Sequence, residues 1–341
     1  MIQLHTEYLG LALRSPIVAS AGPLTGSVDT LMELEQHGVG AVVLPSLFEE
    51  QVEHETYEID RLFELHADSF LEAPSMFPEL DDEASDERYL RLIEAARSSI
   101  DVPVIASLNG ANVGGWVRYG RLLESAGASA IELNLYTVAS DPLMSSAEVE
   151  SEQLSLVALL ADELTVPLAV KISPFYSSLG SFVVGLQSAG AAGVVMFNRF
   201  YQPDLDAEAL DMVPSLSLSS SDDSRLPLRW AGLLRDHLSM SIAASSGVHA
   251  GLDAAKLLLA GADVVMMTSA LLRNGTGHVE AVETELQAWM RDHEYESVGQ
   301  LRGAARFGAL ADPAAYERAN YIGNLATYTS RHLGRGPIHV T

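Results

Sequence analysis

The chain has 341 residues, is 48% hydrophobic and contains no cysteine. It can therefore bury a large core, but it cannot form disulfides or hold an iron-sulfur cluster through its own thiolates. A formal charge of -26 repels nucleic-acid phosphates and anionic membrane surfaces, so neither is an expected partner. The apolar runs are too short to cross a bilayer, and "MIQLHTEYLG" lacks a signal-peptide pattern, which together predict a cytoplasmic protein.

Four segments share one junction, in which a helical pattern ends at glycine and an apolar strand follows. They are "HGVGAVVLPS", "AGASAIELNL", "AGAAGVVMFN" and "AGADVVMMTS". Glycine suits the left-handed residue that ends a helix, and a Val-rich run suits a strand covered on both faces. Further strands fit "SPIVAS", "VPVIASLN", "VPLAVKIS" and "MSIAASSG". Eight alternating units predict an α/β fold, a (β/α)8 TIM barrel over residues 1–303, with its active site at the C-terminal ends of the strands.

An open, doubly wound sheet is the alternative, but "ASAGPLTG" does not space its glycines as the dinucleotide signature does. Two connections are long, Glu49 to Ala84 and Phe200 to Arg229. Such loops form lids or substrate walls in some barrels and are plain surface excursions in others. Residues 304–341 are expected to form a C-terminal tail that packs on the barrel or on a partner subunit.

Polar side chains recur where the predicted strands end, and a polar rim on an apolar barrel predicts a pocket for a polar small molecule. Within "LAVKIS", Lys171 stands in an otherwise buried strand, although the chain has only one other lysine, Lys256. A buried ammonium needs a partner or a function. Lys171 is therefore either a Schiff-base nucleophile or a fixed cation beside developing negative charge, unless it simply reaches solvent from the rim.

The loops after the seventh and eighth predicted strands carry Ser245, Ser246 and Gly247, then Thr268 and Ser269. Barrels commonly bind phosphate there through backbone N–H groups and hydroxyls, although serine and glycine also occur there merely as helix caps. The histidines and carboxylates show no convincing metal-ligand spacing, so no metal site is predicted.

Six segments occur in an order that resembles the dihydroorotate dehydrogenase family: "SPIVASAG", "ELNLYT", "AVKISP", "MFNRF", "ASSGVHAGLDA" and "GADVVMMTSALL". The resemblance covers roughly residues 1–303 and implies a (β/α)8 barrel that binds flavin mononucleotide (FMN), with a role in pyrimidine biosynthesis. It implies that Ser20 and Ser46 lie beside the flavin and that Asn134 hydrogen-bonds in the flavin and substrate region. Lys171 would face the flavin N1/O2 edge, and the phosphate would lie against Ser246, Gly247, Thr268 and Ser269.

The departures from the family concern the substrate. Family members typically continue Asn-Leu-Ser-Cys-Pro-Asn, whereas this chain reads Asn134-Leu135-Tyr136-Thr137-Val138-Ala139. Thr137 thus stands where the family has its base, and Tyr136 is an alternative proton carrier or a pocket wall. A lysine found after strand two in many members is replaced by Pro45. Asn198 is kept as a substrate residue, and Arg199 is expected to replace the missing lysine as a carboxylate anchor.

Three functions follow from these residues. The first is an FMN-dependent dehydrogenase that oxidises a CH-CH bond of dihydroorotate or a related small molecule, with Lys171 and either Thr137 or Tyr136 in catalytic roles. The second is a barrel lyase or aldolase that uses Lys171 as a Schiff base. The third is a non-catalytic flavin electron-transfer subunit. An electron-acceptor protein and a homodimer are the partners that the resemblance suggests.

Overall fold

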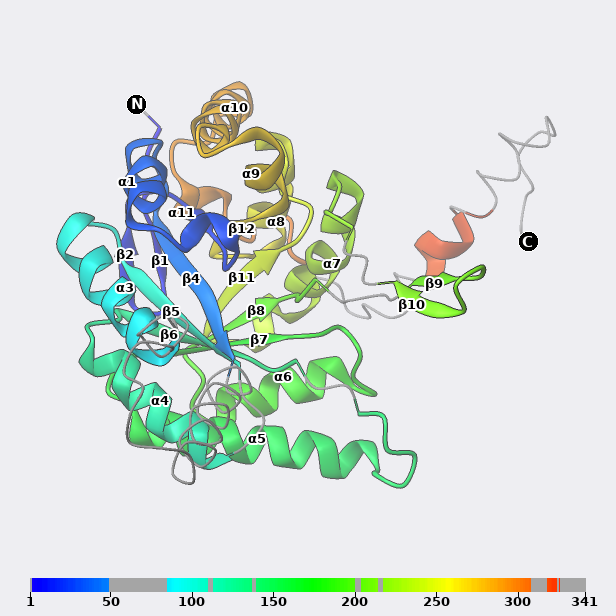
Figure 1. The fold of residues 1–341 in the computed structure, drawn as a ribbon. Helices are drawn as coiled ribbons and strands as arrows, with labels where there is room; N and C mark the ends of the chain where they lie inside the picture. The colour runs from blue at the N-terminus through cyan, green and yellow to red at the C-terminus, as the bar shows by residue number, and fades with distance from the viewer. Residues whose placement is uncertain are drawn as a thin grey trace, which may run out of the picture.

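The computed structural model describes residues 2–48, 85–109, 113–136, 139–199, 204–213, 217–307, 318–323 and 325. Eight parallel strands close into a barrel in the order β11-β12-β3-β4-β5-β6-β7-β8 (Figure 1). This confirms the predicted (β/α)8 class, and all eight predicted strands are barrel strands. Their bounds are β3 (Ile17–Ala19), β4 (Ala41–Phe48), β5 (Val104–Asn109), β6 (Ala130–Asn134), β7 (Leu168–Ile172), β8 (Gly193–Met196), β11 (Ser241–Ser245) and β12 (Val264–Met267).

Helices cover the outside of the barrel, as the alternating pattern requires (Figure 1). The longer ones are α1 (Val28–Gln36), α3 (Ser85–Ser99), α4 (Val113–Ser125), α5 (Ser146–Glu163), α6 (Leu179–Ser188), α7 (Arg225–Leu234), α8 (Gly251–Ala260) and α10 (His278–Asp292). Short helical turns are η1 (Pro23–Thr25), η2 (Ser221–Ser224), η3 (Arg235–His237), α9 (Ser269–Asn274) and α11 (Val298–Leu301). No helix in these described ranges is long and apolar enough to cross a membrane.

The strands alternate between two apolar layers, so each strand is covered on both faces. One side of every strand packs against the helices, and the other side fills the barrel with small and branched residues such as Val18, Ala169 and Val195. A hairpin of β1 (Thr6–Tyr8) and β2 (Leu11–Leu13) closes the N-terminal end of the barrel. Its Tyr8 is 1% exposed within the inner layer. The barrel is thus packed solid at that end, and open space lies at the other.

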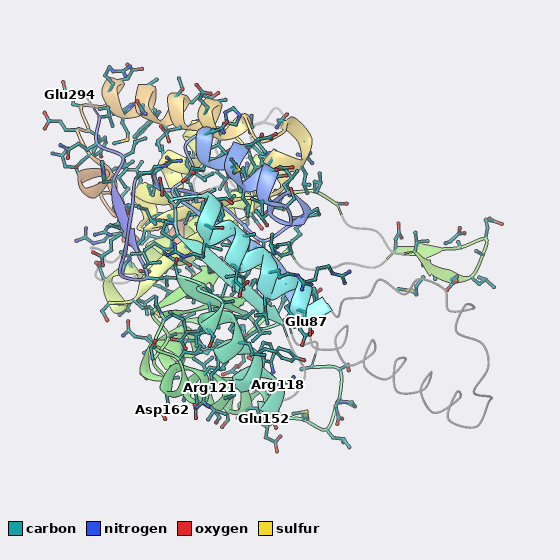
Figure 2. All side chains as sticks on the ribbon, turned by 60° about the vertical axis from the view of Figure 1, so that its left-hand side comes forward. Glu87, Arg118, Arg121, Glu152, Asp162 and Glu294 are labelled. Atoms are coloured by element: carbon teal, nitrogen blue, oxygen red, sulfur yellow. The ribbon has the colours of Figure 1, made fainter. Side chains whose placement is uncertain are left out.

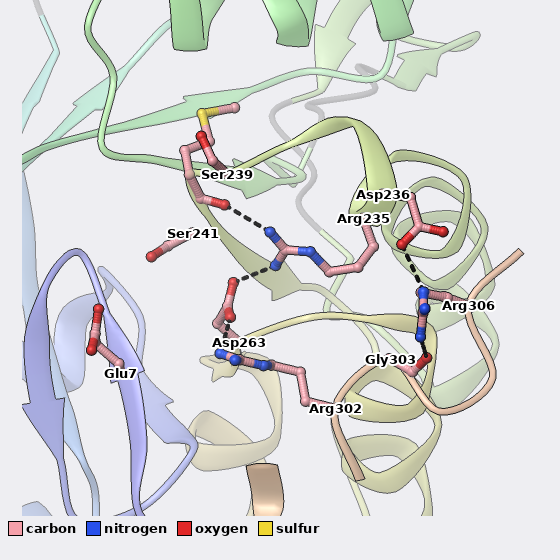
Figure 3. Close-up of a pocket in the computed structure, with 10 residues that line it drawn as sticks. Glu7, Arg235, Asp236, Ser239, Ser241, Asp263, Arg302, Gly303 and Arg306 are labelled. Carbon is pink, nitrogen blue, oxygen red and sulfur yellow. Dashed lines mark hydrogen bonds and ion pairs between the residues drawn. The ribbon is translucent and has the colours of Figure 1, made fainter. Parts of the chain in front are cut away.

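An arginine-carboxylate cluster joins the N-terminal ends of β11 and β12 to α11 (Figure 3). Asp263 receives Arg235 at 2.9 Å and Arg302 at 2.6 Å, and its carboxylate also accepts the N–H of Ile242 at 2.6 Å. Arg235 further donates to backbone carbonyls, including that of Leu238. These bonds satisfy backbone groups at the closed end of the barrel, and a pocket of about 410 Å³ lies beside them.

The connection predicted to run from Phe200 to Arg229 is shorter than expected, because α7 begins at Arg225. Pro227 stands in the first turn of that helix, where a backbone N–H has no intrahelical partner, and so it does not delay the helix. Before it lie η2 and an exposed hairpin of β9 (Asp204–Asp206) and β10 (Asp211–Val213). The Glu49 to Ala84 connection lies outside the described residues.

The molecular surface carries the excess of acidic groups. Figure 2 shows Glu87, Arg118, Arg121, Glu152, Asp162 and Glu294 on the outside of the molecule. Of these, Arg121 pairs with Glu163 across α4 and α5. The start of the expected C-terminal tail packs on the barrel. Ala305 donates its N–H to the carbonyl of Leu259 at 2.9 Å, and Phe307 packs beside Gly232. Most residues after 307 lie outside the described ranges.

Candidate functional site

Polar side chains replace the apolar filling in the C-terminal half of the barrel. They come from neighbouring strands: Ser20 follows β3, Ser107 belongs to β5, Glu132 and Asn134 to β6, and Lys171 to β7. The register places Glu132 beside Ser107 and Asn134 beside Lys171. Because inward side chains of adjacent strands lie at similar heights, the four strands bring these groups together inside one barrel.

Lys171 is paired with the carboxylate of Glu132 inside the barrel, where Lys171 is 9% exposed and Glu132 is 1% exposed. Its Nζ lies 3.3 Å from Oε1 of Glu132 and donates to Ser20 Oγ at 3.4 Å. The ammonium therefore does not reach solvent from the rim, which the sequence left open. The two side chains thus form a buried ion pair at the C-terminal end of the barrel.

Four buried side-chain atoms of the described residues have no hydrogen-bond partner: Tyr8 Oη, Glu132 Oε2, Asn134 Oδ1 and Asn198 Nδ2. Buried polar atoms are nearly always satisfied, and an exception marks a functional group or a missing ligand. An acceptor and a donor left free at the same barrel mouth fit a heterocycle that carries both N–H and C=O groups.

A pocket of about 520 Å³ opens at this end of the barrel. Its walls combine apolar surface with the polar strand ends, as small-molecule sites do. It is lined by Ser20, Ala21, Gly22, Pro23, Phe48, Lys171, Arg199, Ser217, Leu218, Ser219, Ser245, Ser246, Gly247, Val248, Met266, Thr268, Ser269 and Leu272. We call it the mouth pocket.

The two predicted phosphate loops form one side of the mouth pocket. Ser246 and Gly247 both have positive φ, 80° and 79°, so the chain turns sharply after β11 and directs backbone groups at the pocket. Thr268 precedes α9, and Ser269 begins it. Loops after strands seven and eight are the usual anion site of this barrel architecture, because their backbone N–H groups can point at a ligand.

A segment that we call the strap, Ser217–Ser224, lies across these loops. Its Ser219 N–H donates to Ser269 Oγ at 3.1 Å, and Ser221 Oγ donates to Asp253 at 2.7 Å. A methyl group at Gly247 would lie 2.1 Å from the backbone nitrogen of Ser224, so η2 rests directly on the loop. The strap is thus a fixed wall of the pocket.

Arg199 lies on the pocket wall but is already engaged. Its Nε donates to the carbonyl of Ser217 at 2.9 Å, and its Nη1 pairs with Asp223 at 3.0 Å. Burial opposes ionisation of Asp223, but hydrogen bonds from Ser220 and the Arg199 guanidinium outweigh it and hold the pKa of Asp223 below its usual value. The arginine therefore fixes the strap, and only its remaining donors face other partners.

The remaining predicted site residues are placed as follows. Ser46 contacts Ser107, with the two hydroxyls 2.7 Å apart, and so belongs to the same barrel end. Asn198 is 8% exposed, and its backbone N–H donates to Ile172. Tyr136 follows β6 and is half-buried. Thr137 lies outside the described residues.

Two features of the site escaped the sequence reasoning. Glu132 was visible as a charged residue in an apolar strand, and inward alternation with Asn134 was a usable signal for it. The Ser219–His249 contact had no such signal, because the two residues belong to different loops and meet only in the folded barrel. Among the described residues, no group of three His, Asp or Glu side chains is arranged to hold a metal ion.

The fold and site define a class: a (β/α)8 barrel with an ionic core and an anion-suited pocket at the C-terminal ends of its strands. Residues 3–290 match the family model of dihydroorotate dehydrogenase, and the chain belongs to this family of oxidoreductases. This confirms the resemblance read from the six segments.

Individual relatives are distant but span the chain. The catalytic subunit of dihydroorotate dehydrogenase B (NAD(+)) from Thermoplasma acidophilum is 25% identical over 320 residues, covering 89% of this chain and 99% of the relative. Dihydroorotate dehydrogenase A (fumarate) from Lactobacillus helveticus is 22% identical over 320 residues, covering 90% of this chain and all of the relative. The NAD-dependent dihydropyrimidine dehydrogenase subunit PreA of Escherichia coli is 25% identical over 223 residues, which is 60% of this chain and 53% of the relative.

Proposed function

We propose that the protein binds FMN in the mouth pocket and oxidises a CH-CH bond of dihydroorotate or a related ring compound. The observation that carries this proposal is the buried Lys171–Glu132 pair beside two unpaired amide atoms, Asn134 Oδ1 and Asn198 Nδ2. When bound, FMN accepts the hydride from the substrate. The protein supplies orientation, fixed charge and the proton acceptor.

Unpaired atoms at the strand ends fit a flavin ring, and donors that line the mouth pocket fit its phosphate. Asn134 Oδ1 is free to accept a ring N–H, and Asn198 Nδ2 is free to donate to a ring carbonyl. The mouth pocket offers backbone and hydroxyl donors for a phosphate, which come from Ser246, Gly247, Thr268 and Ser269. These are the cofactor residues that we assign, together with Ser20 and Ser46.

Lys171 is best explained as a fixed cation. Its Nζ is held by two partners, a buried carboxylate oxygen of Glu132 at 3.3 Å and Ser20 Oγ at 3.4 Å. A cation held in a low-dielectric barrel stabilises negative charge that develops on a bound ring. A Schiff-base nucleophile must be free to attack a carbonyl, so these two contacts favour the fixed cation over the lyase.

Proton removal from the substrate is assigned to Thr137 or Tyr136, which follow the end of β6. A hydroxyl is a weak base unless a neighbour accepts its proton. The backbone N–H of Tyr136 donates to the carbonyl of Asn134 at 3.0 Å, so the chain turns directly after β6.

Arg199 bears on the choice of substrate. Dihydroorotate carries a carboxylate, and we propose Arg199, which lines the pocket, as the anchor of that carboxylate. Part of the positive charge of Arg199 is, however, neutralised by Asp223. This observation favours a second substrate, a neutral 5,6-dihydropyrimidine, in keeping with the name of the PreA relative. Because four relatives are named as catalytic subunits of dihydroorotate dehydrogenase B (NAD(+)), we also propose a partner protein that accepts the electrons. A homodimer and a cytoplasmic location remain predictions.

The test is an anaerobic titration of the purified protein followed by its visible spectrum. Flavin absorption that bleaches with dihydroorotate supports the first substrate, and bleaching only with 5,6-dihydrouracil supports the second. Flavin absorption that neither compound bleaches favours the electron-transfer subunit. A protein that neither contains flavin nor binds added FMN contradicts the proposal.

The role of Arg199 is tested by Arg199→Gln, with Arg229→Gln as a control on α7. If Arg199 anchors the carboxylate, the variant weakens dihydroorotate binding about tenfold, since a hydrogen bond to a charged group contributes about 1.5 to 3 kcal/mol. Affinity for 5,6-dihydrouracil should not change. Equal loss for both compounds would show that Arg199 acts only by holding the strap.

A further inference from the structure

The strap places a serine hydroxyl at the phosphate end of the mouth pocket. Ser219 is 3% exposed and lines the pocket together with Gly247. The Gly247 N–H donates to Ser219 Oγ at 3.4 Å, and His249 Nε2 lies 3.1 Å from the same oxygen. The first bond is long, so the amide is only weakly held and remains available to a better acceptor.

A guanidinium adds positive charge behind this serine. Arg273 of α9 donates to the carbonyls of Ser219 at 2.7 Å and Leu218 at 3.1 Å, and these neutral acceptors do not cancel its charge. In a chain of charge -26, a cation held against carbonyl oxygens beside a pocket of N–H and O–H donors favours an anionic ligand there.

The charged groups that face His249 come from every element around it. Arg273 lies on α9, His278 on α10 and Asp253 on α8. The Asp253 carboxylate already accepts the N–H groups of His249 and Ala250 and the hydroxyl of Ser221 on the strap. On the strap itself, Asp223 is neutralised by Arg199. Burial, followed by the charge of Arg273, lowers the pKa of His249, while Asp253 partly opposes them.

Resting on the proposed FMN site, we infer that Ser219 and His249 bind the flavin phosphate as a relay. In this arrangement the Nε2–H of His249 donates to Ser219 Oγ, and the Ser219 O–H donates to a phosphate oxygen alongside the Gly247 N–H. The relay makes this end of the pocket specific for a phosphate dianion, and it couples phosphate binding to uptake of one proton by His249.

This proton uptake follows from the two directions in which the hydrogen bond between Ser219 and His249 can point. With an unprotonated Nε2, the hydroxyl proton points at the imidazole and the pocket receives lone pairs, which repel an anion. With a proton on Nε2, the hydroxyl proton is released toward the pocket. The neutral Nε2–H tautomer does this too, but only a ring protonated on both nitrogens also brings positive charge. A dianion therefore binds the doubly protonated ring better, and by linkage its affinity rises as the pH falls toward the lowered pKa of His249 in the free protein.

The experiment compares FMN with riboflavin, which lacks the phosphate, by flavin-fluorescence titration of the flavin-free full-length protein. The pH range is 6.5 to 8.5, where the FMN phosphate is mostly a dianion because its second pKa is about 6. The FMN-to-riboflavin affinity ratio should rise by about threefold or more as the pH is lowered over this range, because one proton is taken up on binding. Inorganic phosphate should compete with FMN but not with riboflavin.

Two variants and two controls separate ligand contact from structural support. Ser219→Ala should lower the ratio about tenfold at pH 6.5, since a hydrogen bond to a charged group is lost, and by less at pH 8.5. His249→Gln keeps a donor and should make the ratio independent of pH. Ser221→Ala, which loosens the strap without touching the pocket, and His5→Gln, at the exposed N-terminal face, should both behave like the unaltered protein.

A ratio that is flat with pH in the unaltered protein, or unchanged by Ser219→Ala, overturns the relay while leaving the flavin site in place. A drop with Ser221→Ala as large as that with Ser219→Ala also overturns it, because the strap would then act only as a wall. If neither flavin binds at any pH, the proposed function fails and the relay fails with it.

Discussion

At the scale of single residues, the centre of this protein is one ion pair held inside a barrel. Inward alternation along β6 and β7 places Glu132 and Lys171 in the interior, where each charge alone would be strongly unfavourable. Their pairing offsets that cost and also fixes the ammonium beside Ser20. The pair thus links the stability of the barrel to the electrostatics of the proposed flavin site.

Removing the cation should expose the cost of the buried carboxylate. Lys171→Met leaves the Glu132 carboxyl, 1% exposed, without its cation, and we expect the free energy of unfolding of flavin-free protein to fall by about 3 to 5 kcal/mol. Adding Glu132→Gln to that variant should restore part of the loss. Urea unfolding of the two single variants and the double variant measures this; losses that simply add would show that the two residues do not interact.

At the scale of elements, the strap and the loop after β11 are fitted to each other through a glycine. Gly247 has φ 79°, and a Cβ there would meet the backbone of Ser224 at 2.1 Å. Gly275 offers a matched comparison, since its φ is 82° and no atom of the described residues lies within 4 Å of the place that a Cβ would take. Both glycines have a positive φ, and only at Gly247 would a Cβ meet other atoms of the described residues.

Gly247→Ala should therefore displace the strap, whereas Gly275→Ala should cost only the strain of a positive φ, about 1 kcal/mol. Hydrogen exchange of the backbone amides in residues 217–224 should become faster in the first variant and stay unchanged in the second. FMN affinity should fall with Gly247→Ala alone. Equal exchange in the two variants would mean that η2 does not rest on the loop.

The closed end of the barrel relies on the cluster around Asp263 (Figure 3). Asp263→Asn removes the negative charge that faces Arg235 and Arg302, and we expect a loss of about 2 to 4 kcal/mol in the free energy of unfolding. Because this cluster lies at the opposite end from the mouth pocket, the FMN-to-riboflavin affinity ratio of folded protein should not change. A changed ratio would show that the two ends of the barrel are coupled.

At the scale of the whole molecule, charge and topology act separately. The formal charge of -26 lies largely on a surface that the helices present to solvent, while the described barrel interior combines the Lys171–Glu132 pair with apolar layers. Self-repulsion of a net charge far from zero destabilises the compact state, and salt screens it.

Stability should therefore rise with moderate salt. Between 20 and 300 mM NaCl, concentrations over which the screening length falls severalfold, the urea midpoint of flavin-free protein should increase. KCl serves as a control for ion identity. A midpoint that falls instead would mean that attractive surface ion pairs, such as Arg121–Glu163, outweigh the repulsion.

Much of this protein could be predicted from its sequence because the information is local. The glycine that ends a helix and the apolar run that follows it indicated the strands, and the order of six segments indicated the family that residues 3–290 match. Lys171, Ser246, Thr268 and Arg199 were found by the same rule, since polar residues at strand ends of a parallel barrel converge.

Only the tertiary structure decided which partners these strand-end residues contact. Whether Lys171 reaches solvent or Glu132 depends on the neighbour and register of β6 and β7, and Arg199 meets Asp223 only after the strap returns across the mouth. The Ser219–His249 contact likewise joins loops 30 residues apart. Sequence alone determined the barrel and the class of its chemistry, because periodicity and turn residues act locally. The pairings that set charge and access arise from strand register and loop packing, which no local pattern encodes.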